Sequence, residues 1–98
     1  MVNILTVENF QETIEKNDLS LIQIKSSWCQ PCKTLAANLE RAELNLPIEV
    51  IDIDVQEDIA NQYGIRSVPT LVLLDENIEM KRNVGVKTPK LLKEWAGV

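Results

Sequence analysis

The chain has 98 residues, of which 45% are hydrophobic and 26% are charged, a composition typical of one globular domain over residues 1–98. The formal net charge of −5 and the scattered lysine and arginine residues argue against direct binding to nucleic-acid phosphates. Histidine is absent, which excludes catalytic sites that need a histidine base and zinc sites that need histidine ligands.

No segment of the sequence is typical of membrane insertion or export. The longest uninterrupted apolar run is Leu71 to Leu74, whereas a transmembrane helix needs about 20 residues. The N-terminus lacks a basic segment followed by an apolar one, which is the pattern of a secretory signal. We therefore expect a cytoplasmic protein that does not bind a membrane.

Strand and helix patterns alternate along the chain, beginning with a short strand at residues 4–5. A helix is predicted from the N-cap Thr6 to residue 17, because apolar side chains recur there at helical spacing. Residues 19–25 are typical of a strand with two differently composed faces. These faces are Ile22 and Ile24 on one side and Leu21, Gln23 and Lys25 on the other.

A loop leads directly into a second helix, which we expect to continue to Pro47 because four apolar residues form one stripe along it. A strand is predicted at residues 49–55. Asp54, with Glu57 three residues later, has the form of a capping box, so a short helix should begin there and end at Gly64. The stripe of the second helix consists of Leu35, Leu39, Ala42 and Leu46.

Residues 69–74 are continuously apolar and bounded by turn residues, which predicts a central strand covered on both faces. A hairpin turn at 75–77 should return the chain as an edge strand over 79–86. Thr88 as N-cap and Pro89 at the first helical position predict a last helix. The order β-α-β-α-β-α-β-β-α indicates an α/β domain with helices on both faces of a mixed sheet. The apolar face of the last helix is expected to contain Leu91, Leu92 and Trp95.

The only two cysteines, Cys29 and Cys32, lie where the loop meets the start of the second predicted helix. A zinc or iron–sulfur site would lack ligands, and a c-type haem site would need histidine where Lys33 stands. A disulfide serving only structure would close a very short loop and stabilise the fold little. A chance spacing of two thiols is a further alternative. A redox-active dithiol that needs no metal and no other cofactor explains this position best.

The helix N-terminus predicts different roles for the two thiols. Unpaired N–H groups and the positive end of the helix dipole favour the thiolate of Cys29, which we expect to be an exposed nucleophile toward a substrate disulfide. Cys32, one turn further along, should be shielded and should resolve the mixed disulfide by intramolecular attack. Pro31 is compatible with the first helical turn, where N–H groups are unpaired in any case.

The hexapeptide WCQPCK at residues 28–33 resembles the active-site motif of the thioredoxin family, with Gln30 where thioredoxins usually have glycine. The octapeptide YGIRSVPT at residues 63–70 is similar to the family's second signature, and Gly85 matches a glycine of its substrate groove. The resemblance covers essentially the whole chain. It implies a thioredoxin fold, with a central mixed β-sheet of four to five strands flanked by helices on both faces. It also implies a reductase of protein disulfides that is recycled by a thioredoxin reductase or an equivalent electron donor.

The resemblance also assigns residues to a substrate groove beside the dithiol. The proline of the second signature is cis in the family and faces the dithiol, so the Val68–Pro69 bond is expected to be cis. The residues alone would favour an ordinary trans proline at the start of a strand. The residues that the resemblance places along the groove are Trp28, Val68, Pro69 and Gly85.

Two positions beneath the dithiol depart from the family pattern. Thioredoxins carry a buried aspartate there, often paired with a lysine on the neighbouring strand, and Gln23 and Val50 occupy these positions. Lys25 stands where many thioredoxins have an aromatic residue. Losing a carboxylate and adding an ammonium should favour thiolate and raise the reduction potential, so that Gln23 and Lys25 modulate the pKa of the dithiol. Alternatively, Lys25 extends to solvent and leaves the thiols unaffected.

A second function is also compatible with the sequence. A thioredoxin-fold subunit or processivity clamp would use the same groove to bind a partner protein, and its redox activity would be incidental. Replacing both cysteines by serine distinguishes the two, because only an enzyme would lose its function. In either case we expect a monomer.

Overall fold

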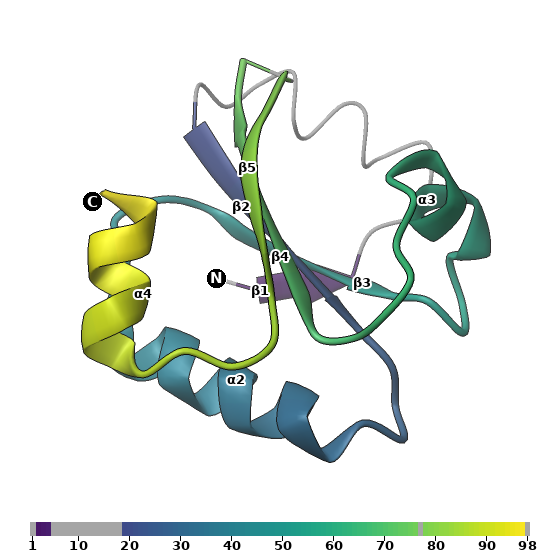
Figure 1. The fold of residues 1–98 in the computed structure, drawn as a ribbon, viewed down its shortest axis with the longest axis horizontal. Coiled ribbons are helices and arrows are strands. Elements are labelled where there is room, and N and C mark those ends of the chain that lie inside the picture. Colours follow the sequence, from purple (N-terminus) through teal and green to yellow (C-terminus); the bar gives the residue numbers. More distant parts are fainter. Residues whose placement is uncertain (1, 5–18, 77, 98) are drawn as a thin grey trace.

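Within the described residues the sheet has five strands: β1 (Val2–Ile4), β2 (Leu19–Lys25), β3 (Ile48–Asp52), β4 (Thr70–Asp75) and β5 (Ile78–Val84). Their order is β1-β3-β2-β4-β5 (Figure 1). β3 pairs in parallel with β1 and β2, whereas β4 pairs antiparallel with β2 and β5, so the sheet is mixed as expected. The computed structural model describes residues 2–4, 19–76 and 78–97, and the helix predicted over residues 7–17 lies outside them.

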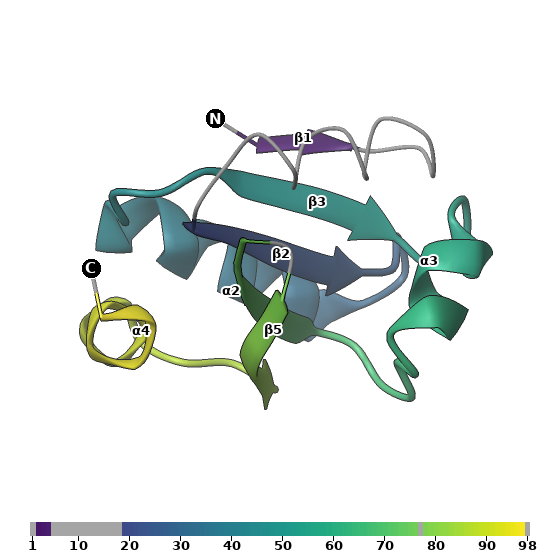
Figure 2. The same ribbon diagram turned by 90° about the horizontal axis from the view of Figure 1, so that it is seen from above.

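Helices cover both faces of the sheet. The helices α2 (Gln30–Ala42) and α4 (Pro89–Ala96) lie together on one side (Figure 2), and α3 (Glu57–Gln62) packs on the other. Successive side chains of β2 point to opposite faces of the sheet and so contribute to both layers. Leu21 packs in the cluster beneath α2 and α4, whereas Ile22 packs with Ile59 of α3. The larger of the two clusters consists of Leu21, Leu35, Leu39, Ala42, Ile48, Leu71, Leu73 and Leu92.

The helix α2 ends earlier than its apolar stripe predicts. It stops at Ala42, and Glu43 adopts a left-handed conformation with φ of 50°. The chain then turns so that the carbonyl of Pro47 accepts the N–H of Leu21, 2.9 Å away, and β3 enters the sheet. Leu46 therefore packs against the core from a loop, and Pro47 is not the residue that ends the helix.

The strand β3 also ends early, at Asp52 and not at residue 55. The carbonyl of Asp52 accepts the N–H groups of Val55 and Gln56, which closes a turn. The predicted capping box is wrong, because Gln56 is the N-cap of α3 and its side chain makes no capping bond. The carboxylate of Asp54 instead accepts hydrogen bonds from Ser27 on a neighbouring loop.

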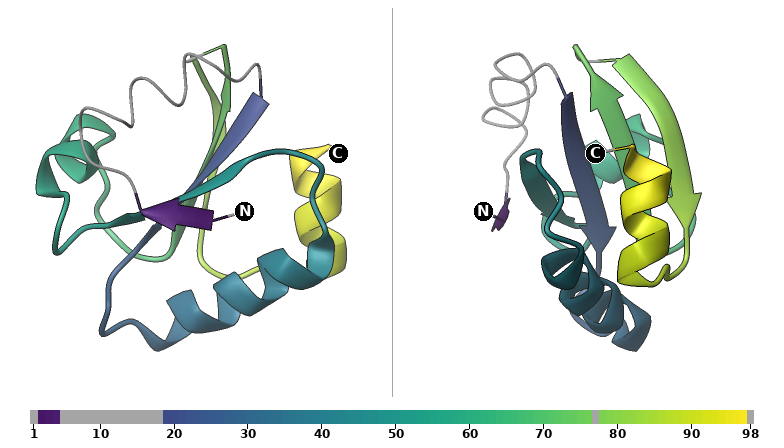
Figure 3. Two further views of the ribbon diagram at one scale, coloured as in Figure 1. Left: turned by 180° about the vertical axis from the view of Figure 1, so that it is seen from behind. Right: turned by 90° about the vertical axis from the view of Figure 1, so that its left-hand side faces the viewer.

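The C-terminal third follows its prediction closely. The strand β5 forms the edge of the sheet opposite β1 (Figure 3). The Thr88 side chain caps α4 by accepting the N–H of Leu91 at 3.3 Å, as predicted. Leu92 is fully buried and Trp95 packs against the core, but Leu91 is 46% exposed and does not belong to the buried face. Its expected burial was wrong because α4 contacts the core along a narrower stripe than the sequence suggests.

Candidate active site

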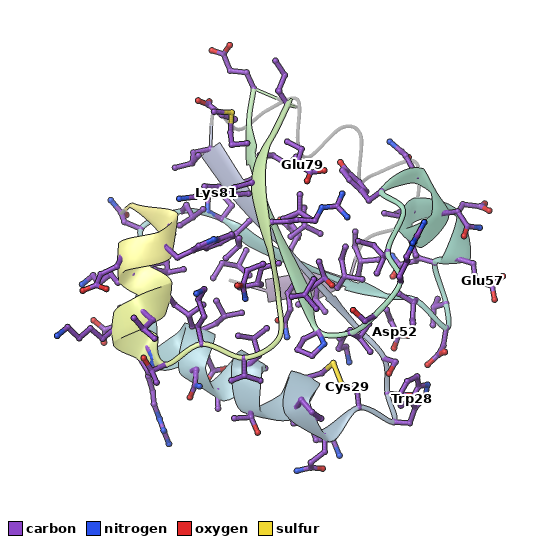
Figure 4. The ribbon with its side chains drawn as sticks, in the orientation of Figure 1. Trp28, Cys29, Asp52, Glu57, Glu79 and Lys81 are labelled. Carbon is purple, nitrogen blue, oxygen red and sulfur yellow. A yellow bond between two sulfur atoms is a disulfide. The ribbon has the colours of Figure 1, made fainter. Side chains whose placement is uncertain are left out.

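Cys29 and Cys32 form a disulfide at the N-terminus of α2, with their Cα atoms 5.3 Å apart (Figure 4). The strand β2 leads into a short loop at residues 26–28, and this loop delivers Cys29 to the start of the helix. The expected pairing of the two thiols is thus present in the structure. The helix that holds it is 13 residues long, which gives it a substantial dipole.

Cys29 is the N-cap of α2. Its Sγ accepts the backbone N–H of Cys32 at 3.2 Å, so one otherwise unpaired donor of the first turn points at this sulfur. Pro31 lies within that first turn, which contains no acidic residue. In the disulfide form Cys29 is 4% exposed and Cys32 is 1% exposed. The expectation of an exposed Cys29 is therefore wrong for this form, although Cys32 is the more shielded of the two.

The groove residues named by resemblance lie at the same end of the sheet as the disulfide. Ile24 in β2 pairs with Thr70 in β4, which places Pro69 beside the end of β2 from which the cysteine loop departs. The Val68–Pro69 bond is cis, as expected. The N–H of Gly85 donates to the carbonyl of Pro69 at 3.0 Å, and Gly85 has a φ of +99°, a conformation that favours glycine.

The side chains of these groove residues differ in exposure. Pro69 is buried, and Val68 is half-buried against the cluster beneath α3. Trp28 is 72% exposed and extends from the loop beside Cys29 (Figure 4). The structure thus joins Pro69 to Gly85 directly and offers Trp28 as an apolar surface next to the disulfide.

A neutral amide lies behind the disulfide. Gln23 is 2% exposed, and its Nε2 donates to the carbonyl of Cys32 at 3.5 Å. Val50 is its neighbour in register on β3. Gln23 and the half-buried Lys25 both line an open cavity of about 700 Å³ between α2 and the sheet. Within the described part of the chain, the Lys25 ammonium makes no hydrogen bond and no ion pair, so its predicted influence on the thiols stays a prediction.

A polar turn beside the cysteine loop, built around Asp52, is not among the features predicted from the sequence. Asp52 is only 7% exposed, and its Oδ1 accepts the N–H of Asp54 at 2.8 Å. The Gln56 side chain accepts the N–H of Asp52 at 3.0 Å. The spacing of Asp52 and Asp54 is the sequence signal that could have revealed this turn, because an aspartate commonly accepts the N–H two residues on.

Other chemistry finds no support in the described residues. Among residues 2–4, 19–76 and 78–97, no three or more acidic or cysteine side chains are grouped so that they could hold a metal ion. None of the described helices is long and apolar enough to cross a lipid bilayer. Burial raises the pKa of the Glu49 carboxyl, but this residue follows Ile48 on β3 and faces away from α2, toward the opposite side of the sheet from Gln23.

Comparison with known proteins places this site in context. A sequence model of the thioredoxin family matches residues 1–97. Thioredoxin from Chlamydia trachomatis is 40% identical over 90 residues, which cover 89% of this chain and 87% of that protein. Thioredoxin from Rickettsia bellii is 32% identical and covers 97% of this chain and 95% of its own length.

Solved structures agree with these sequence matches. A mutant thioredoxin from Halobacterium salinarum superposes with a TM-score of 0.85 at 28% identity, covering 96% of this chain and 88% of that one. Oxidised mitochondrial thioredoxin 3 from Saccharomyces cerevisiae gives a TM-score of 0.86 at 25% identity, with coverage of 98% and 93%. These matches favour an enzyme over a subunit that only binds a partner protein. The chain belongs to the thioredoxin family and is a thiol–disulfide oxidoreductase, a protein-disulfide reductase whose redox pair is Cys29 and Cys32.

Proposed function

We propose that Cys29 is the nucleophile of this reductase and that Cys32 is the resolving thiol. The observation that carries the proposal is the hydrogen bond from the Cys32 N–H to Cys29 Sγ. In the reduced protein the same N–H and the positive end of the α2 dipole would stabilise a thiolate on Cys29. Cys32, at 1% exposed against 4% for Cys29, is the more shielded residue, which supports its role as the resolving thiol.

The proposed reaction transfers two electrons from the dithiol to the substrate. The Cys29 thiolate forms a bond to one sulfur of the substrate disulfide, and the other substrate sulfur leaves as a thiolate that is protonated by water. Cys32 then loses its proton to water, and its thiolate attacks the Cys29 sulfur. The second substrate sulfur leaves, and Cys29 and Cys32 end as the disulfide present in the structure.

Trapping with single serine variants tests this assignment. Cys32→Ser should accumulate a mixed disulfide between Cys29 and a protein substrate, because no thiol remains to resolve it. Cys29→Ser should form no such adduct and should reduce protein disulfides at least about 1,000-fold more slowly. Adducts that form through Cys32 in the Cys29→Ser variant would reverse the two roles.

We also propose that an extended substrate segment binds along Trp28, Val68, Pro69 and Gly85. The direct bond between Gly85 and Pro69 and the exposure of Trp28 support this groove. An extended segment has free backbone groups that could pair with the backbone here. No cofactor beyond the redox-active disulfide is needed for the proposed reaction.

The cellular setting is proposed on the likeness to named thioredoxins. The protein would be a cytoplasmic monomer that contributes to electron transport and cell redox homeostasis, with a thioredoxin reductase or an equivalent donor as its source of electrons. The net charge of −5 supports the absence of nucleic-acid partners. Reduction of the purified protein by a thioredoxin reductase and NADPH tests the donor, and analytical ultracentrifugation tests the monomer.

We further propose that Gln23 and Lys25 make this dithiol a weaker reductant than one with a buried aspartate behind it. Gln23 holds the backbone of Cys32 but cannot ionise. Lys25 lies two residues further along the same face of β2 as Gln23 and lines the same cavity, which Glu40 and Glu43 also line. Because Gln23 is an amide, no carboxylate at that position opposes the positive charge of Lys25. A positive charge near the thiols favours thiolate, and a stabilised reduced form has a higher reduction potential.

A further inference from the structure

Two neighbouring loops each carry a highly exposed apolar side chain, and one of these loops leads directly into Cys29. Trp28, in the loop before α2, is 72% exposed, and Val55, in the turn before α3, is 74% exposed. These are the two largest exposures among the bulky apolar side chains of the described residues. Exposed apolar surface that adjoins a reactive site is typical of a contact surface for a partner.

Hydrogen bonds hold the two loops together. The backbone N–H and the hydroxyl of Ser27 both donate to Oδ2 of Asp54, at 3.5 and 3.4 Å. The N–H of Ile53 donates to the carbonyl of Lys25 at 2.9 Å. Trp28 follows one member of the Ser27–Asp54 pair and Val55 follows the other, so both lie next to the same junction. We call these two residues the apolar platform.

The platform continues the reactive surface, because Trp28 immediately precedes Cys29. Its far side is acidic: Glu57 and Asp58 follow Val55 in the first turn of α3, and both are exposed. Within the described part of the chain neither carboxylate has an ion-pair partner. A ligand that covers the platform therefore meets apolar surface near the disulfide and negative charge beyond it.

We propose that the apolar platform and the neighbouring carboxylates Glu57 and Asp58 select substrate segments that carry an apolar residue and a basic residue beside the reactive cysteine. The apolar side chain covers Val55 and Trp28, and the lysine or arginine reaches the first turn of α3. This inference rests on the proposed function, because the platform contributes to substrate specificity only if Cys29 is the sulfur that attacks the substrate disulfide. The surface thus adds a second contact region to the groove around Pro69.

Peptide mixed disulfides test the proposal. Each synthetic peptide carries one cysteine linked to 5-thio-2-nitrobenzoate, and the release of the coloured thiolate gives the rate of attack by the reduced protein. Four peptides place Leu-Lys, Leu-Glu, Ser-Lys or Ser-Glu next to the cysteine, in separate sets on its N- and C-terminal sides. The wild-type protein should react about 10-fold faster with the best Leu-Lys peptide than with its Ser-Glu counterpart.

Two variants separate the apolar and the electrostatic contributions. Val55→Ser should reduce the preference for leucine over serine by about 3-fold, because the platform loses its apolar contact. Glu57→Gln/Asp58→Asn should reduce the preference for lysine over glutamate by about 3-fold and weaken its dependence on salt. Matched controls at the far end of the sheet are Ile78→Ser and Asp75→Asn/Glu76→Gln, which also alter exposed residues and should leave both preferences unchanged.

A small disulfide that cannot reach the platform distinguishes this proposal from the proposed function. The rate with 2-hydroxyethyl disulfide should be unchanged in Val55→Ser and lost in Cys29→Ser. A Cys29→Ser protein that still attacks the small disulfide would contradict the proposed function. Equal rates of the wild-type protein with all four peptides, or a preference for glutamate through Lys33 or Arg66, would overturn the platform while the role of Cys29 stands.

Discussion

The front and the rear of the Cys29–Cys32 disulfide differ in how closely they follow the thioredoxin pattern. On the front, the residues that the family resemblance assigns to a groove include Gly85 and Pro69, which are hydrogen-bonded, and the exposed Trp28. At the rear, Gln23 replaces a carboxylate with an amide that bonds the carbonyl of Cys32. The residues proposed to bind substrate and those proposed to affect proton transfer are therefore different ones, so changes at the rear should alter rate and potential while leaving the groove intact.

The sharpest test of that separation restores the acid at the rear. Gln23→Asp should change the rate of disulfide reduction near neutral pH by about 10-fold, because a buried carboxylate can transfer the proton of Cys32 whereas an amide cannot. The variant should also make the rate less dependent on pH. Stopped-flow measurement with a peptide disulfide between pH 6 and 9 gives both quantities. An unaltered rate constant would mean that water alone serves Cys32. Gln23→Asn is the control, because it has the shape of Asp but cannot ionise.

The second test removes the positive charge at the rear. Lys25→Met should lower the reduction potential by about 30 mV, which corresponds to a shift of one pKa unit of the thiolate or about 1.4 kcal/mol. Thiol trapping in glutathione buffers measures the potential, and Lys90→Met on α4 is the control. A potential that does not move would show that Lys25 is screened by solvent.

The third test concerns the front. Gly85→Ala should lower the free energy of unfolding by about 1 kcal/mol, because a residue with a Cβ is strained at a φ of +99°. Nothing lies within 4 Å of the added Cβ, so the cost is conformational and not steric. Urea unfolding measures it. Gly97, at the end of α4, has a φ of +76° and provides the control. Gly97→Ala should lose comparable stability without losing activity. Gly85→Ala should lose stability and also reduce peptide disulfides more slowly.

The smallest expected effect lies far from both sides of the disulfide. Arg82 donates to both oxygens of Glu79 at 2.7 and 2.8 Å, and these hydrogen bonds hold the pKa of the Glu79 carboxyl below its usual range. The resulting stability is present above the ordinary glutamate pKa and is lost as pH falls through the lowered value. Because the pair is partly exposed, Arg82→Gln should cost only about 0.5 kcal/mol at pH 7, and less at about pH 3. Thermal unfolding at the two pH values checks this, and the reduction potential should not change.

The regions that the sequence predicted well are those whose signals are local. The alternation of apolar and polar residues located β2 at residues 19–25, and the apolar run at 69–74 located β4 to within a residue. Thr88 and Pro89 marked the start of α4, because a side-chain cap and an N-terminal proline act within one helical turn. The site followed from two short motifs and their resemblance to a family.

The predictions were wrong where contacts with residues far away in the sequence override a local pattern. Asp54 had the spacing of a helix cap, but its carboxylate is bound by Ser27, 27 residues earlier. The apolar stripe of α2 extended to Leu46, but the chain leaves the helix at Glu43 to bring Pro47 and β3 to the edge of β2. Leu91 and Leu92 are both at helical spacing with Trp95, but only the packing of α4 decides which of the two is buried.

By itself, the sequence determined the dithiol, the helix N-terminus that holds it and the class of fold, because spacing, capping and periodicity are properties of neighbouring residues. Only the tertiary structure decided what surrounds the sulfurs: the amide of Gln23 behind Cys32, the bond between Gly85 and Pro69, and the hydrogen bonds between Ser27 and Asp54 that join the two loops. Those contacts join strands and loops that are far apart along the chain. Their geometry depends on sheet register and packing, which no local pattern records.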